Sequence, residues 1–152
     1  MVPACESILK KKKIFYRLVR LGAKGITAKD VLNHSPEPVK PGQICKTIVL
    51  KGHDGSYFAC CVLSSRKIDL QRVKGYVGQD AFIAPSSEIK KACGYAPGEV
   101  CPVLIDLELY VDKTVFDFSE LHFGSGDVHY GLIMDPRDLY KIRPFYAGDI
   151  SS

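Results

Sequence analysis

The 152-residue sequence lacks any hydrophobic run long enough to cross a bilayer, since a membrane-spanning helix needs ~20 consecutive apolar residues. Its longest uncharged stretches have the length of strands and are interrupted by glycine, proline or charge. The lysines near the N-terminus are not followed by an apolar signal-peptide core or a small-residue cleavage site. We therefore expect a cytoplasmic protein with no membrane partner.

Motifs for metals and for the common cofactors are also missing. Zinc sites usually show two C-x-x-C or H-x-x-x-H arms, and neither spacing occurs. The sequence has no Gly-x-Ser-x-Gly nucleophile elbow, no Walker loop and no dinucleotide fingerprint that opens a helix. We therefore predict neither a metal nor a cofactor, and no serine-hydrolase mechanism.

The six cysteines lack the density and paired spacing of a secreted disulfide scaffold, which favours a reducing compartment. A disulfide between Cys93 and Cys101 stays open as an alternative. Cys45 is also open as a nucleophile, although it precedes Lys46 on a predicted strand, where neighbours point to opposite faces.

What the sequence does contain is sufficient for one globular domain of residues 1–152, because 46% of the residues are hydrophobic. The net charge of +4 is unevenly distributed, with six basic residues between Lys10 and Arg20. Such a cluster can bind a phosphate backbone, and it is equally typical of a solvated helix face.

Hydrophobic periodicity and turn residues predict short helices mixed with hairpins. An amphipathic helix is expected over residues 7–21, and a second short helix is expected after an N-cap at Thr27. A hairpin is expected from 46–50 and 57–63. Further helices are predicted over 68–73, over 86–93 with a stop at Gly94, and from Asp135; further strands are predicted over 81–84, 104–111, 121–123 and 130–134. The pattern predicts an α+β fold, a single domain with a mixed, mostly antiparallel sheet or open barrel flanked by short helices.

Three segments contain residues suited to chemistry. Lys46 opens an apolar strand, where a fixed ammonium could face a phosphate or carbonyl oxygen, although strand-edge lysines are more often solvated. Residues 94–102 contain two glycines and two prolines after a helix, and such a loop can expose backbone N–H groups or simply cap the helix. Residues 124–131 form a glycine-rich polar loop between strands, typical either of a ligand-facing loop or of a polar turn.

In this order and at these separations, the three segments resemble the YbaK and prolyl-tRNA-synthetase-associated family of aminoacyl-tRNA editing domains. The resemblance covers roughly Lys46 to Ile142, fades upstream of Gln43, and leaves residues 1–34 as a helical N-terminal part outside the best-matching region. It is found in Lys46-Thr47, Asp69-Leu70, the spacing of Gly94, Gly98 and Pro102, and the glycine loop that leads to Asp135-Pro136-Arg137-Asp138-Leu139.

The resemblance implies a trans-acting deacylase that hydrolyses the ester of mischarged tRNA, with Cys- or Ala-tRNA(Pro)-like substrates. It implies substrate assistance, in which a ribose hydroxyl of the terminal adenosine activates water. The implied partners are the aminoacylated 3′ end of tRNA and an aminoacyl-tRNA synthetase, and not DNA. A non-catalytic module of the same fold, which binds tRNA or a synthetase, is the alternative.

The resemblance also implies the site residues. The catalytic residues would be Lys46, Gly98 and His129, and the substrate-binding residues would be Gly94, Pro102, Gly124, Ser125, Gly126, Asp127 and Gly131. The order Gly124-Ser125-Gly126 departs from relatives whose loop begins with serine, and Gly131 stands where several relatives have a polar residue. The other histidines, His34, His53 and His122, are expected to be surface or partner-bonded side chains.

Overall fold

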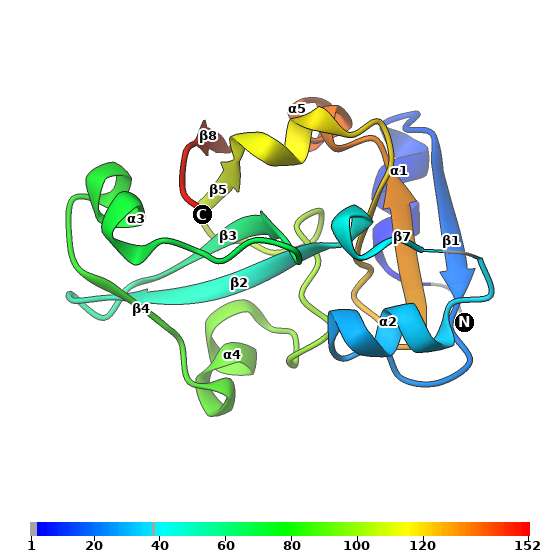
Figure 1. The fold of residues 1–152 in the computed structure, drawn as a ribbon, viewed down its shortest axis with the longest axis horizontal. Coiled ribbons are helices and arrows are strands. Elements are labelled where there is room, and N and C mark those ends of the chain that lie inside the picture. The colour runs from blue at the N-terminus through cyan, green and yellow to red at the C-terminus, as the bar shows by residue number, and fades with distance from the viewer. Residues whose placement is uncertain (1–2, 38) are drawn as a thin grey trace.

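A computed structural model describes residues 3–37 and 39–152 of the chain, which form two sheets bordered by short helices (Figure 1). In chain order the elements are α1 (Cys5–Lys11), β1 (Tyr16–Arg20), α2 (Ala28–His34), η1 (Pro41–Gln43), β2 (Cys45–Gly52), β3 (Tyr57–Leu63), α3 (Leu70–Val77), β4 (Ala81–Ile83), α4 (Ser86–Cys93), β5 (Leu109–Asp112), η2 (Lys113–Asp117), β6 (Leu121–Gly124), β7 (Tyr130–Met134), η3 (Pro136–Asp138), α5 (Leu139–Ile142) and β8 (Tyr146–Gly148).

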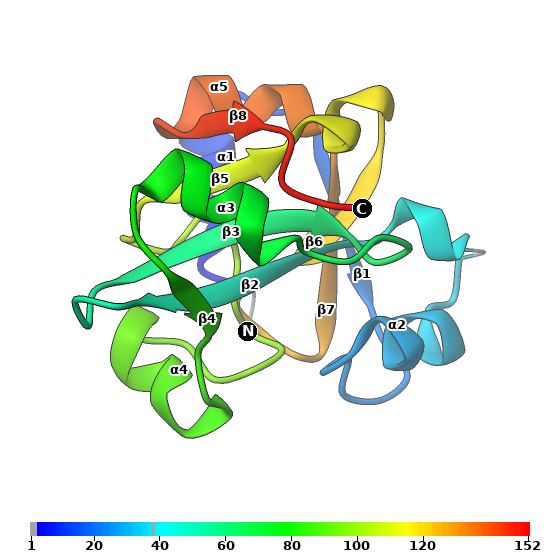
Figure 2. The same cartoon turned by 60° about the vertical axis from the view of Figure 1, so that its left-hand side comes forward.

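The two sheets confirm the predicted α+β single domain. One sheet has the order β1-β7-β6 and is antiparallel throughout. The other has the order β4-β2-β3-β5-β8, in which the pairs of β3 with β5 and β5 with β8 are parallel. The sheets run steeply across each other, and a bridge between Ile44 and His122 joins them (Figures 1 and 2).

The predicted hairpin is confirmed as β2 and β3, which are joined by the turn at residues 53–56. Alternate residues of these strands face two different cores, as the period of two requires. Cys45 and Val49 face the larger core between the two sheets, whereas Leu50 faces a smaller core that includes Val73 of α3. β2 therefore has one buried row on each face, and its first residues reach the junction of the sheets.

The helix predicted over residues 7–21 is wrong in its second half. α1 ends at Lys11, and Lys13 adopts the left-handed conformation with φ of 58°. The chain then forms β1, in which Val19 pairs with Gly131 of β7. Cross-strand pairing with β7 outweighs the helical spacing of the apolar residues, because it buries Val19 in the sheet. Residues 1–34 are therefore not wholly helical.

The other predictions hold in part. α2 and α4 form as expected: Thr27 and Asp30 make a reciprocal capping box, and Gly94 ends α4 with φ of 83°. The strand expected over 104–111 forms only at Leu109–Asp112. The preceding loop is held instead by Arg143, which donates hydrogen bonds to three of its carbonyl groups.

All six cysteines are free, so Cys93 and Cys101 do not form the disulfide left open above. Cys101 is buried in the larger core with Cys5, and the Cys93 thiol donates to the carbonyl of Ile89 at 3.3 Å. Within the described residues, no helix is both long enough and apolar enough to span a membrane.

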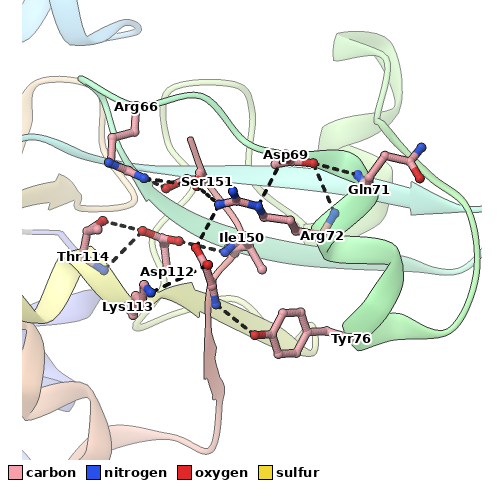
Figure 3. A network of polar contacts seen from close by, with 11 residues as sticks. Arg66, Asp69, Gln71, Arg72, Tyr76, Asp112, Lys113, Thr114, Ile150 and Ser151 are labelled. Carbon is pink, nitrogen blue, oxygen red and sulfur yellow. Dashed lines mark hydrogen bonds and ion pairs between the residues drawn. The ribbon is translucent and has the colours of Figure 1, made fainter.

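A buried carboxylate ties the C-terminal residues to the second sheet (Figure 3). Asp112 is fully buried, accepts a hydrogen bond from the Ile150 N–H at 2.9 Å, and accepts two more from Thr114. Beside it, the Ser151 carbonyl accepts from Arg72 at 2.7 Å. Burial alone would raise the pKa of Asp112, but its hydrogen bonds with Thr114 and the Ile150 N–H favour the ionised form and lower the pKa overall.

Because the folded pKa of Asp112 is depressed, the stability that it contributes is present above its unfolded pKa of about 3.9 and is lost as the pH falls through the folded pKa. Asp112→Ala is expected to cost about 3 kcal/mol at pH 7, because two N–H groups lose their acceptor. Urea unfolding of wild type and Asp112→Ala at pH 7 measures this cost. Wild type and Asp112→Asn are then compared between pH 7 and pH 2. If these two proteins lose stability in parallel below pH 4, the titration of Asp112 is not responsible.

Candidate functional site

A cavity of about 440 Å³ lies where the two sheets meet. Its wall is built from the start of β2, the facing parts of β6 and β7, the start of α2 and the loop at residues 98–100. Among the described residues that line it there is no aspartate and no glutamate, whereas Lys29 and Lys46 both contribute. The cavity is therefore suited to a ligand with anionic or oxygen-rich groups.

Lys46 brings the clearest functional group to this cavity. Strand β2 positions it, and its side chain is half-buried at the wall. Its ammonium forms no ion pair with any of the residues that the structure describes. By contrast, Lys51 on the same strand pairs with Glu88 at 2.8 Å outside the cavity. Lys46 thus keeps its charge available for a bound ligand.

Cys45 also lines the cavity, but its chemistry does not suit a nucleophile. The side chain is 2% exposed, and this burial raises the pKa of the Cys45 thiol well above its ordinary value. The reactive form of cysteine is the thiolate, so Cys45 remains a neutral thiol at neutral pH. The structure thus argues against the open alternative of a nucleophile at this position.

The start of α2 forms a wall that the sequence did not indicate. Gly98 has φ of 85°, and a Cβ added to it would lie 2.7 Å from the Cα of Ile26. Only glycine allows this approach, which brings the Gly98 loop against the residue that precedes the Thr27 cap. The N–H of Gly98 makes no hydrogen bond to a described residue, so it remains a free donor beside the cavity.

Gly124 and Gly131 pair with each other across β6 and β7, and both line the cavity. The two glycines have different surroundings. A Cβ at Gly124 would lie 2.3 Å from the carbonyl oxygen of Val100, whereas a Cβ at Gly131 would make only one contact, at 3.7 Å. Gly124 therefore lets the loop at residues 98–100 pack on the sheet, and Gly131 leaves open space.

Gly124→Ala is expected to destabilise the protein by about 2 kcal/mol, a fall in Tm of about 4–8 °C, because the clash is with backbone. Gly131→Ala, the matched control on the partner strand, should leave Tm within about 2 °C of wild type. Thermal unfolding of both variants tests the difference. Equal Tm values would show that the Val100 loop moves away without cost.

Residues 125–129 of the glycine loop lie outside the cavity wall. The Ser125 hydroxyl is buried, 2.7 Å from the carbonyl oxygen of Tyr130 and 2.9 Å from that of Asp127. A Cβ at Gly126 would meet Leu104 at 2.6 Å. Asp127 accepts from the N–H of His129, whose ring lies 3.7 Å from the same carboxylate. These side chains hold the loop together, and the structure does not bring the His129 ring beside Lys46.

Two residues of the earlier loop also lie away from the cavity wall. Gly94 is the C-cap of α4, and its N–H donates to the carbonyl of Lys90 at 2.8 Å. Pro102 is buried, and its carbonyl accepts from Arg143 at 3.2 Å. Of the ten predicted site residues, the structure brings together Lys46, Gly98, Gly124 and Gly131.

The sequence reasoning missed His122, which was expected to be a surface or partner-bonded side chain. His122 is 8% exposed and lines the cavity, and its Nδ1 has no hydrogen-bond partner among the described residues. Tyr130 was missed too, and its hydroxyl accepts from Arg20 at 3.0 Å. No spacing in the sequence marks either residue, because their position depends on the pairing of β6 with β7 and of β7 with β1.

The six basic residues between Lys10 and Arg20 do not all lie on one element of secondary structure. Lys10 and Lys11 end α1, whereas Arg17 on β1 pairs with Glu120 at 2.7 Å and with Glu37 at 3.0 Å. The segment is therefore not a single basic helix face. Among the described residues no group of three or more histidine, cysteine, aspartate or glutamate side chains could hold a metal ion.

The part of the chain that builds the cavity is similar to known proteins. A family model described as the aminoacyl-tRNA editing domain matches residues 26–142, which extends the match upstream to the α2 wall. The crystal structure of hypothetical protein APE2540 is 21% identical and covers 97% of this chain and 98% of that one, with a TM-score of 0.88. The crystal structure of "a putative trans-editing enzyme for prolyl tRNA synthetase" is 22% identical and covers 100% and 99%, with a TM-score of 0.82. At these identities the two structures establish the shared fold, and the family match over most of the sequence shows that this chain belongs to the aminoacyl-tRNA editing domain family.

Proposed function

We propose that this protein is a trans-acting aminoacyl-tRNA deacylase, which hydrolyses the ester of a mischarged tRNA of the Cys- or Ala-tRNA(Pro) type. The observation that supports this most directly is Lys46, whose ammonium has no ion-pair partner in the described residues and which lines a cavity without carboxylates. The 3′ end of an aminoacylated tRNA brings a phosphate and an ester carbonyl, and both are suitable partners for an ammonium. The cavity of about 440 Å³ admits only a part of such a ligand, namely its aminoacyl-adenosine end.

Ester hydrolysis needs a water nucleophile, a proton acceptor and donors for the developing oxyanion. Lys46 and the Gly98 N–H are the groups that we assign to the oxyanion and the neighbouring phosphate. The neutral Cys45 thiol is not suited to be the nucleophile. We assign activation of water to the free ribose hydroxyl of the terminal adenosine, so that the protein provides shape and electrostatic stabilisation.

The assay that tests the function measures the release of amino acid from tRNA(Pro) charged with cysteine, alanine, serine or proline. We expect hydrolysis of at least one mischarged ester and little hydrolysis of the correctly matched one. Discrimination between side chains that differ by a methylene is worth only about 1–3 kcal/mol, so the preferred ester should lead its neighbours by about tenfold to a hundredfold.

The same panel distinguishes the deacylase from a binding module of the same fold. A protein that binds the charged tRNAs and releases no amino acid from any of them is a module, and the deacylase proposal is then wrong. The salt dependence of binding also distinguishes recognition of the aminoacyl end from binding to the tRNA backbone alone. Binding through backbone phosphates alone weakens steeply with salt and does not depend on the aminoacyl group.

A further inference from the structure

His122 has an unusual position for a buried histidine. Its Nδ1 is a buried side-chain nitrogen with no hydrogen-bond partner among the described residues, and the same side chain lines the cavity. Folded proteins satisfy nearly all buried polar groups, because an unsatisfied group loses its hydration without compensation. An unpaired nitrogen at a cavity wall therefore points to a partner that arrives with the ligand.

The sheet register shows where that partner would lie. His122 and Gly124 share one face of β6, and pairing with β7 places Gly131 opposite Gly124. A Cβ added at Gly131 would have a single neighbour within 4 Å, which is His122 Nδ1 at 3.7 Å. The space that a side chain would fill at residue 131 thus lies beside the ring nitrogen. A ligand atom that hydrogen-bonds Nδ1 has to come about 1 Å closer to it than this Cβ position.

The charge state of the ring narrows the chemistry of the partner. Burial lowers the pKa of His122 below its ordinary value, so the imidazole is neutral at neutral pH. A neutral imidazole has one N–H donor and one acceptor nitrogen, and its tautomer adapts to the partner. A hydroxyl group can donate or accept, so it satisfies Nδ1 in either tautomer. A hydrogen or methyl group in the same place leaves the nitrogen unpaired.

We infer that His122 is a ligand-binding residue of the cavity, whose Nδ1 hydrogen-bonds a hydroxyl group of the ligand in the space beside Gly131. The inference rests on the proposed function, because it takes the aminoacyl-adenosine end of tRNA as the ligand. That end offers hydroxyl groups from two sources, the ribose and a hydroxyl-bearing amino acid such as serine. His122 would favour a ligand with the contacted hydroxyl over the same ligand without it.

Equilibrium binding of four non-hydrolysable probes tests this. The probes are the seryl and alanyl amides of 3′-amino-3′-deoxyadenosine, each with and without the 2′-hydroxyl. For wild type, the probe with the contacted hydroxyl is expected to bind about tenfold more tightly than its counterpart without it. His122→Phe should bring that ratio close to one, and His122→Asn, which keeps a polar atom near the Nδ1 position, should restore most of it. The affinity ratio that falls to about one in His122→Phe shows whether the ribose or the amino acid provides the contacted hydroxyl.

Thermal unfolding separates binding from a role in the fold. His122→Phe removes an unsatisfied polar atom, so its Tm should equal or exceed that of wild type. A lower Tm together with an equal loss of affinity for all four probes would assign His122 to the fold and overturn the inference. It is also overturned if His122→Phe keeps both wild-type ratios, or if wild type binds none of the probes.

The two proposals fail in different ways. A wild-type protein that binds the probes but hydrolyses no aminoacyl-tRNA contradicts the deacylase proposal alone. A wild-type protein that hydrolyses mischarged tRNA, with probe ratios that do not depend on His122, contradicts this inference alone.

Gly131→Ser provides an independent variant, because its Cβ would lie 3.7 Å from Nδ1 and its hydroxyl would come within reach of the ring. The serine hydroxyl should raise Tm by about 2–4 °C. It should also weaken binding of the probe with the contacted hydroxyl about tenfold. An unchanged Tm and an unchanged affinity would contradict the position assigned to the ligand hydroxyl.

Discussion

Replacing Lys46 with alanine is expected to lower the rate constant of deacylation by about 10²- to 10³-fold, the effect of losing one oxyanion-stabilising donor. The side chain is half-buried at the cavity wall, and no carboxylate among the described lining residues shares its charge. The loss of this ammonium removes the cation that we assign to the developing negative charge, although Lys29 still lines the cavity. Single-turnover hydrolysis of the preferred mischarged tRNA measures the effect.

Lys51→Ala is the matched control for this experiment. Lys51 lies on the same strand, but its ammonium pairs with Glu88 outside the cavity. The Lys51→Ala protein should therefore hydrolyse the mischarged tRNA at about the wild-type rate. Both variants should keep a Tm close to that of wild type. Wild-type turnover by the Lys46→Ala protein refutes the catalytic assignment of this residue, whatever the control shows.

A mischarged tRNA that ends in 2′-deoxyadenosine is expected to be hydrolysed about 10²-fold more slowly than the same tRNA with its ribose hydroxyl. The reason is that the described cavity wall has no carboxylate to act as a base, and its Cys45 thiol is neutral. In the proposed mechanism the vicinal hydroxyl then becomes the group that activates water. The enzymatic rate for each tRNA is compared after division by its uncatalysed rate in the same buffer.

Two measurements guard this comparison. The affinity of the deoxyadenosine tRNA shows whether a slow rate reflects poor binding, and the uncatalysed rate corrects for the lower intrinsic reactivity of the deoxy ester. If the corrected rates agree, a protein group activates water. In that case His122 is the first candidate, since it is the buried imidazole at the cavity wall.

The glycine loop shows how far the sequence could identify the site. Composition left open whether residues 124–131 face a ligand or form a polar turn, and the family resemblance implied site roles for six of them. Only Gly124, Tyr130 and Gly131 line the cavity. The Ser125 hydroxyl and the Asp127 carboxylate are used by the loop itself. Composition could indicate a special loop here, because glycine and short polar residues favour turns. Composition could not tell which polar groups would be consumed inside the turn.

The N-terminal residues show the same limit for secondary structure. Residues 7–21 have the spacing of an amphipathic helix, yet the chain from Tyr16 onward forms β1. A pattern of apolar residues states that one face is buried and does not name the partner that buries it. β7 provides that partner through antiparallel pairing, in which Arg17 lies opposite Ile133.

The sequence by itself determined the features that depend on neighbouring residues: the β2–β3 hairpin, the Thr27 capping box, the Gly94 helix end and the place of Lys46 on a strand. Each of these is set by bonds and backbone preferences within a few residues. The tertiary structure decided the cavity, because it forms where β2, β6, β7 and α2 meet. It also decided that His122 stays unpaired beside Gly131, since this depends on the register of two strands and not on either segment alone.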